Sequence, residues 1–168
     1  MELVTITEKA KKSSFYLWML NFFFERFVPF NLPHRFRITS IGDDSVTTSL
    51  PYRKRNLNHV KGLHACALAT LTEMTSGFML AVKLDPKKFR LILRRLEMDY
   101  MYQGKMDAVC EFIVTPEWMK ANIYDPLTRA DSVDIIAEVK IFDIKGNQLT
   151  LGKAYWQVKD WAKVRTKA

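Results

Sequence analysis

The chain has few of the residues that mark cross-linked, metal-stabilised or unstructured proteins. Among its 168 residues are two cysteines, six glycines and six prolines, and no segment is repeated or of low complexity. Cys66 and Cys110 lie far apart and lack the paired spacing of metal ligands, so we expect neither a disulfide framework nor a metal site. The two unpaired cysteines also favour a reducing compartment. The chain length and its 48% hydrophobic residues predict one globular domain.

A long uninterrupted hydrophobic run is also missing near the N-terminus. The stretch SSFYLWMLNFFFERFVPF, residues 13–30, is broken by Asn21, Glu25 and Arg26, and no small-residue cleavage site follows it. A helix needs about 20 consecutive apolar residues to span a bilayer. We therefore expect neither a signal peptide nor a membrane span here, and we expect a cytoplasmic location.

Positive charge is in excess, at a formal net charge of +8, which admits nucleic acid, acidic lipid or a phosphorylated cofactor as a partner. The basic residues are spread over the chain, at Lys11, Lys12, Arg53, Lys54, Arg55, Lys87, Lys88, Arg94, Arg95 and from Lys163 to Lys167. A nucleic-acid binder usually gathers such residues on one element with aromatic side chains. We therefore expect a solvated basic surface and no nucleic-acid partner.

Residues from about Thr7 to Val28 carry apolar side chains at helical spacing, and Pro29 ends the pattern. They predict an amphipathic helix within an N-terminal segment, residues 1–30, which packs on a single domain formed by residues 31–168. Contact with a membrane surface is the alternative use of the apolar face of this helix.

The rest of the chain is dominated by alternating patterns typical of strands. Six strands are predicted, at residues 35–41, 45–52, 89–102, 105–115, 132–143 and 148–161. In the third, the apolar parity changes at Arg94–Arg95, which indicates a bulge. Thr115 and Pro116 then read as an N-cap and first helical residue, opening a short helix in an insertion that ends near Thr128.

Between the second and third strands lies one long apolar helix that begins near Ala65 and is rich in Ala, Thr, Ser and Gly up to Gly77. Small side chains on nearly every side suit a helix that other elements approach closely. One buried helix and a run of antiparallel strands predict an α+β domain in which a curved sheet wraps around the helix.

A single acid, Glu73, stands in this helix among small apolar residues. Burying a carboxylate is costly unless it is paired or used, so Glu73 is a candidate functional residue; an ion-paired turn is the alternative. His64 lies at the start of the helix, where it either belongs to a site or only bonds a loop carbonyl. Cys66 has no orienting base at a suitable spacing and is not expected to be a nucleophile.

Over residues 36–161 the sequence resembles the hotdog fold, in which an antiparallel sheet encloses one long helix. More closely, it resembles the phenylacetate-pathway-type acyl-CoA thioesterases and a related hotdog family of unknown function. Those thioesterases carry an Asn in the loop, a His-Gly pair at the start of the helix and an Asp within it. The matching positions in this chain are Asn58, His64–Ala65 and Glu73. Asn56 is the alternative for the loop position, and Ala and Glu replace the family's Gly and Asp.

The resemblance implies hydrolysis of a medium- or long-chain acyl thioester, with coenzyme A or acyl-carrier protein as the thiol part of the substrate and no other cofactor. The Ala65 N–H, helped by Asn58, would polarise the carbonyl, and Glu73 would act as a general base or as a nucleophile. The Ala in place of Gly favours the alternative, a non-catalytic hotdog protein that binds acyl groups or serves as a scaffold.

The spacing of His64 and Glu73 bears on assembly. Nine residues on a helix correspond to about 180° of rotation and ~13.5 Å of rise, so the two side chains face opposite ways. A two-fold dimer can bring Glu73 of one subunit to the helix start of the other, as in the family. We expect a homodimer or a dimer of dimers.

Two further groups are candidate substrate contacts. Arg53, Lys54 and Arg55 end the second strand, where they meet coenzyme A phosphates or form a solvated strand end. Trp18 and the run Phe22–Phe24 either roof an acyl tunnel or belong to the core.

Overall fold

The computed structural model describes residues 3–164, and six strands form one antiparallel sheet in the order β1-β2-β4-β5-β6-β3. In chain order, the elements are α1 (Leu3–Ala10), α2 (Ser14–Phe27), the 3-10 turn η1 (Pro29–Asn31), β1 (Arg37–Ile41), β2 (Ser45–Leu50), the 3-10 turn η2 (Lys54–Asn56), α3 (Ala65–Lys83), β3 (Phe89–Tyr100), β4 (Ala108–Ile113), α4 (Pro116–Met119), the π-helical η3 (Lys120–Tyr124), α5 (Asp125–Leu127), β5 (Ser132–Asp143), β6 (Gln148–Asp160) and the 3-10 turn η4 (Trp161–Lys163). All six predicted strands and the central helix are confirmed.

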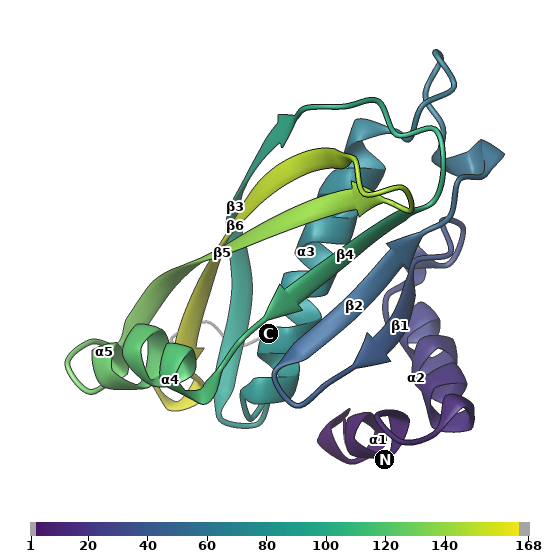
Figure 1. The fold of residues 1–168 in the computed structure, drawn as a ribbon. Coiled ribbons are helices and arrows are strands. Elements are labelled where there is room, and N and C mark those ends of the chain that lie inside the picture. The colour runs from purple at the N-terminus through teal and green to yellow at the C-terminus, as the bar shows by residue number, and fades with distance from the viewer. Residues whose placement is uncertain (1–2, 165–168) are drawn as a thin grey trace.

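Figure 1 shows the sheet curving along α3, with α1 and α2 beside the β1 edge and the short helices α4 and α5 at the far end of the long strands. The curved sheet around one helix confirms the predicted α+β hotdog fold. One edge of the sheet is the short strand β1, against which α2 packs, and the other is the long strand β3.

Alternation along the strands directs one side of the sheet onto α3. The inward residues of β4 and β5 are buried as their spacing predicts: Ala108, Cys110, Phe112, Ile135, Ala137, Val139 and Ile141. In β3, the register against β6 shifts between Leu93 and Arg95, which confirms the predicted bulge. The Thr115 hydroxyl accepts a hydrogen bond from the Trp118 N–H, so the predicted cap before α4 is also correct.

Small residues in α3 allow the sheet to approach it closely. A side chain at Gly152 of β6 would lie 2.7 Å from the Thr72 methyl, and one at Gly77 of α3 would lie 2.8 Å from the Trp156 ring. The indole N–H of Trp156 donates to the Ser76 hydroxyl at 3.1 Å. The stripe of small residues thus serves helix–sheet packing.

Two buried hydroxyl groups on α3, those of Thr75 and Ser76, bond to the preceding turn, whereas that of Thr72 has no hydrogen-bond partner among the described residues. The Thr75 hydroxyl donates to the Leu71 carbonyl one turn earlier, at 2.6 Å, and also lies 2.6 Å from the Thr48 hydroxyl of β2. Ser76 donates to the Thr72 carbonyl at 2.9 Å. Such bonds to the preceding turn let Thr and Ser occupy a buried helix interior.

The prediction of one helix from Thr7 to Val28 is wrong, because two helices occupy this region. The backbone extends at Ser13, with φ −149° and ψ 122°, and α2 starts anew at Ser14. The break lets α1 fold back onto α2 and α3, burying Ile6 and Ala10. Burial of both apolar faces outweighs the continuity of a single helix.

A buried amide fixes α2 to the sheet. Asn21 Nδ2 donates to the Ile38 carbonyl at 2.9 Å, and Asn21 Oδ1 accepts from the Ile38 N–H at 2.8 Å. Glu25, one turn later, is also buried, and its carboxylate lies 3.6 Å from Arg35 and 3.3 Å from Arg37. The inner face of α2 therefore holds the edge strand β1 through polar contacts.

By length and composition, α3 is the one helix in the described part of the chain that could cross a membrane, but 56% of its apolar window is buried within the domain. A core helix passes the same test, and the sheet packs along α3 here.

Candidate active site

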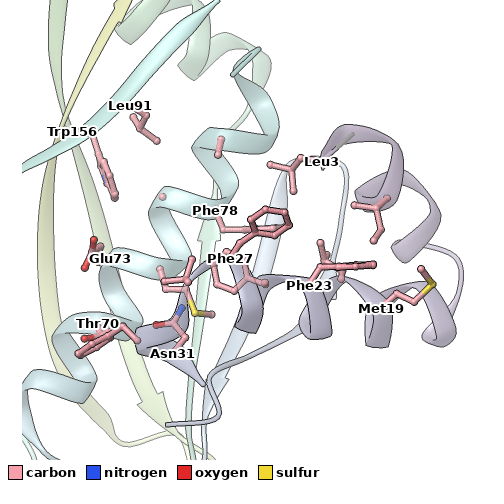
Figure 2. A pocket seen from close by; sticks show the side chains of 18 residues that line it. Leu3, Met19, Phe23, Phe27, Asn31, Thr70, Glu73, Phe78, Leu91 and Trp156 are labelled. Atoms are coloured by element: carbon pink, nitrogen blue, oxygen red, sulfur yellow. The ribbon is translucent and has the colours of Figure 1, made fainter. Parts of the chain in front are cut away.

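A cavity of about 1060 Å³ lies between the N-terminal helices and one side of α3. In Figure 2, Glu73 and Thr70 project from α3, Trp156 and Leu91 stand on the strand side, and Phe23 and Phe27 reach in from α2. The volume is slightly above the range of about 300–1,000 Å³ found for small-molecule pockets. Among the described residues that line the cavity, Glu73 alone is charged.

Two of the aromatic residues considered for an acyl tunnel lie on this wall. Phe23 and Phe24 line the cavity, whereas Trp18 and Phe22 do not. Phe24 also contacts Phe78 of α3 edge to face, at 5.9 Å between ring centroids. Of these four aromatic residues, Phe23 and Phe24 thus belong to the cavity wall, and Trp18 and Phe22 to the outer surface.

The Glu73 carboxylate is half-buried in this wall, and no hydrogen bond or ion pair joins it to any residue between 3 and 164. Burial raises the pKa of Glu73 above its usual value, since the apolar surroundings disfavour the charged form. The sequence left open that Glu73 is only an ion-paired residue at a turn of the helix, but no basic side chain in the described part of the chain pairs with it. A partly desolvated carboxylate beside an apolar cavity can accept a proton from a water molecule or attack an electrophile.

The start of α3 is a second polar centre. His64 caps the helix: its Nδ1 accepts from the Cys66 N–H at 3.1 Å, which leaves the ring proton on Nε2. Ala65 is exposed at the first helical position, and its N–H meets no acceptor among residues 3–164. The tip of the helix thus offers an unpaired N–H at the positive end of the helix dipole.

A side chain that the sequence did not single out, Tyr100, reaches this helix start. Its hydroxyl donates to the Ala65 carbonyl at 3.0 Å, although Tyr100 lies at the end of β3. Nothing in the local sequence around Tyr100 indicates that it contacts a helix 35 residues earlier in the chain. The contact ties the helix start to the outer edge of the sheet.

The two candidate loop asparagines have different roles. Asn56 is fully buried, and its side-chain NH₂ donates to the main-chain carbonyls of His34 and Pro51. The main-chain carbonyl of Asn56 accepts from the His64 N–H at 2.8 Å. Asn58 is partly exposed, and its Oδ1 accepts from two backbone N–H groups of the same turn at 3.1 and 2.9 Å. The Asn58 NH₂ group has no partner in the described part of the chain, so Asn58 keeps a donor that Asn56 has used.

Arg53, Lys54 and Arg55 are exposed where the chain leaves β2 and enters η2. None of the three forms an ion pair with a described residue. They immediately precede Asn56, which holds the start of α3, so this basic group lies in the same loop region as the helix start. Its position suits contact with an anionic group outside the cavity.

The family model described as Domain of unknown function (DUF4442) matches residues 17–165, most of the chain. The chain belongs to this family. No curated protein sequence matches it.

Solved structures with the same fold include proteins named as thioesterases. A Pseudomonas aeruginosa protein named "Probable Thioesterase" has a TM-score of 0.75 and 20% identity, over 81% of this chain and 90% of its own. A Haemophilus influenzae thioesterase has a TM-score of 0.66 and 12% identity, over 94% and 99% of the two chains. A Staphylococcus aureus thioesterase variant has a TM-score of 0.60 and 17% identity, over 78% and 98%. At these identities the likeness establishes the hotdog fold of this DUF4442 protein.

Proposed function

We propose that this chain is a thioesterase that hydrolyses medium- or long-chain acyl thioesters of coenzyme A or of an acyl-carrier protein. The observation that carries the proposal is the unpaired, half-buried Glu73 carboxylate on the wall of a large cavity lined by aromatic rings. The cavity suits an apolar acyl chain, and the carboxylate supplies a base or nucleophile beside it.

In the proposed reaction, the carbonyl oxygen of the thioester accepts a hydrogen bond from the Ala65 N–H, with the Asn58 NH₂ group as a second donor. These donors and the helix dipole stabilise the negative charge that develops on that oxygen. Glu73 either takes a proton from the attacking water or attacks the carbonyl carbon itself. In the first route, the proton that Glu73 takes from water passes to the leaving thiolate as the acid forms. In the second, the thiolate leaves as an anhydride forms between the acyl group and Glu73; water then hydrolyses this anhydride, which frees the carboxylic acid, restores the Glu73 carboxylate and supplies the proton of the thiol.

Glu73 and the start of α3 lie apart on one helix, so the proposed site is completed by a second copy of the chain. The long edge strand β3 supports this assembly, because an unpaired edge can pair with its symmetry mate. Leu91 near the beginning of β3 lines the cavity, and Tyr100 at its end holds the Ala65 carbonyl. Antiparallel pairing of two β3 strands would set the Leu91 end of one opposite the Tyr100 end of the other.

Arg53, Lys54 and Arg55 are the proposed contacts for coenzyme A phosphates. Their exposure in the loop that holds the start of α3 supports this proposal, because an anionic group near the helix start could reach them. Bound acyl groups would thus lie in the cavity while the anionic part of the thiol remains outside.

A thiol-release assay over a series of acyl-CoA chain lengths tests the activity, and light scattering tests the assembly. We expect turnover that increases toward medium or long chains and a mass of at least twice the 19.6 kDa chain. The methyl group of Ala65, where the resembled thioesterases have Gly, favours a second candidate, an acyl-binding protein without turnover. Acyl-CoA retained in native mass spectrometry, with no thiol released, would establish that candidate instead.

A further inference from the structure

Helix α2 has aromatic side chains on the face that points away from the domain. Leu20, Asn21 and Glu25 are buried on its inner face, whereas Phe15, Trp18 and Phe22 are 60%, 59% and 39% exposed. We call Phe15, Trp18 and Phe22 the aromatic ladder. A helix that is apolar on both sides is normally covered on both sides, and this one is covered on one.

The rings of the aromatic ladder form one ordered stripe. The centroids of Phe15 and Trp18 are 6.2 Å apart with an interplanar angle of 27°, and those of Trp18 and Phe22 are 5.8 Å apart at 21°. The Arg26 guanidinium lies 4.8 Å from the centre of the Phe22 ring and continues the stripe. These side chains project together along one side of α2.

The exposed apolar surface continues from the aromatic ladder to the cavity. The Phe22 ring meets Phe23 edge to face at 5.8 Å, and Phe23 and Phe27 line the cavity although they are 41% and 83% exposed. Phe30 of η1, 62% exposed, lines it as well. A continuous apolar surface of this kind on a soluble domain marks an interaction site.

Basic side chains flank this surface. The Lys9 ammonium lies 5.1 Å from the Tyr16 ring, and Lys9, Lys12 and Arg26 form no ion pair with a described residue. The nearby acid Glu8 bonds to Lys11 at 2.6 Å. The accessible charge beside the aromatic ladder is therefore positive.

The buried acid of the same helix does not offset this charge. Glu25 points inward, and its side chain is 7% exposed between Arg35 and Arg37. Asp43 shares Lys11 with Glu8, at 3.0 Å, so one negative charge remains in this cluster against the three positive charges of Lys9, Lys12 and Arg26. Aromatic side chains bordered by uncompensated basic residues are the pattern of helices that lie in a membrane interface.

We propose that α2 docks on an anionic phospholipid bilayer. The helix lies parallel to the surface, the aromatic ladder enters the boundary between headgroups and acyl chains, and Lys9, Lys12 and Arg26 meet the lipid phosphates. The mouth of the cavity, bordered by Phe23, Phe27 and Phe30, then lies at the bilayer surface. This proposal concerns binding and does not rest on the proposed thioesterase activity.

Charge favours a bilayer over a second copy of the chain on this face. A two-fold contact would bring the same patch of both copies together, so Lys9 and Arg26 of each would face basic residues of the other. Anionic headgroups instead complement them, and each basic residue near such a surface contributes favourably at low ionic strength. The proposed pairing of two β3 strands uses the opposite edge of the sheet and leaves the aromatic ladder uncovered.

Flotation of the full chain with vesicles tests the proposal. We expect the protein to float with vesicles of equal phosphatidylcholine and phosphatidylglycerol, to remain behind with phosphatidylcholine alone, and to bind less as salt increases. Trp18→Ser and Phe22→Ser should each weaken binding about tenfold, the scale set by removing one buried aromatic side chain. Ile136→Ser is the matched control, since Ile136 is 52% exposed on the outer face of β5, and it should bind as the parent does.

Fluorescence places the helix directly. Brominated lipid should quench part of the tryptophan emission of the parent, and Trp18→Phe should remove most of that quenching while flotation persists. Thermal unfolding of each variant confirms that its fold is retained. The proposal is overturned if anionic vesicles do not bind the chain, if the Ile136 control weakens binding as much as the ladder variants do, or if the ladder variants instead reduce the mass in light scattering, which would assign this face to a second copy.

Discussion

Replacing Glu73 with Gln is the most direct test of the proposed site. Gln keeps the size of the side chain and its place on the cavity wall, but it can neither accept a proton as a base nor attack a carbonyl as a nucleophile. Because the Glu73 carboxylate bonds no described residue, the change removes no contact that holds α3 in place. Fold and assembly should therefore survive.

The expected loss of activity follows from the role assigned to the carboxylate. A positioned acid or base contributes about 10²–10⁴-fold in rate, so Glu73→Gln should lower kcat by at least about 100-fold. That factor equals about 2.7 kcal/mol of transition-state stabilisation. Thiol release from a saturating acyl-CoA substrate measures it, and KM should change little because the acyl chain contacts the aromatic wall.

Although Glu73→Gln should lower activity, it should not lower the free energy of unfolding. Burial raises the pKa of Glu73, so between the unfolded and folded pKa values the native state holds more protons than the unfolded state. The free energy of unfolding therefore falls as the pH rises through this interval. Glu73→Gln removes that penalty, and the variant should be at least as stable as the parent at neutral pH, with the difference vanishing in acid.

Glu138→Gln is the matched control. Glu138 is exposed on the outer face of β5, away from the cavity, and its replacement should leave kcat and the unfolding curve unchanged. Activity of Glu73→Gln within a few-fold of the parent would refute the assignment of Glu73. The assignment of Glu73 would also be refuted if urea unfolding showed that Glu73→Gln is destabilised and that this loss of stability accounts for its inactivity.

Three further results are expected from the packing. Asn21→Ala should lower the free energy of unfolding in urea by about 1–3 kcal/mol, because both backbone groups of Ile38 lose their partner; no change would mean that α2 is not held through this amide. Gly152→Ala should cost about 1–3 kcal/mol, since the new methyl would lie 2.7 Å from a threonine methyl of α3. In native protein, iodoacetamide should modify the exposed Cys66 and spare Cys110, whose thiol pKa burial raises to about 12. Equal labelling at both positions before unfolding would contradict this burial.

Local patterns were sufficient for most of the fold. Strand alternation is a property of neighbouring residues, so the inward faces of β4 and β5 and the bulge after Leu93 could be predicted from the sequence. The Thr115 cap is equally local, since it requires one hydroxyl and a helix that begins at Pro116. The α+β arrangement of a curved sheet around one helix followed from the order of these elements, and the resemblance to the hotdog fold agrees with it.

The N-terminal region shows where such reasoning fails. Helical periodicity continues from Thr7 to Val28, but the chain breaks near Ser13 because α1 gains burial by folding back on α2 and α3. Periodicity reports which side chains are apolar and does not say which surface covers them. The outward direction of Trp18 and Phe22 could not be foreseen for the same reason.

The candidate site divides in the same way. The sequence by itself determined that α3 carries one acid, Glu73, and that its start, at His64, is nine residues away on another side of the helix. Only the tertiary structure decided that Glu73 faces a cavity, because the wall is made by α2, β3 and β6, which meet α3 through packing between distant segments. It also distinguished Asn56 from Asn58, since two similar turn residues differ only in which backbone groups the folded loop brings to them.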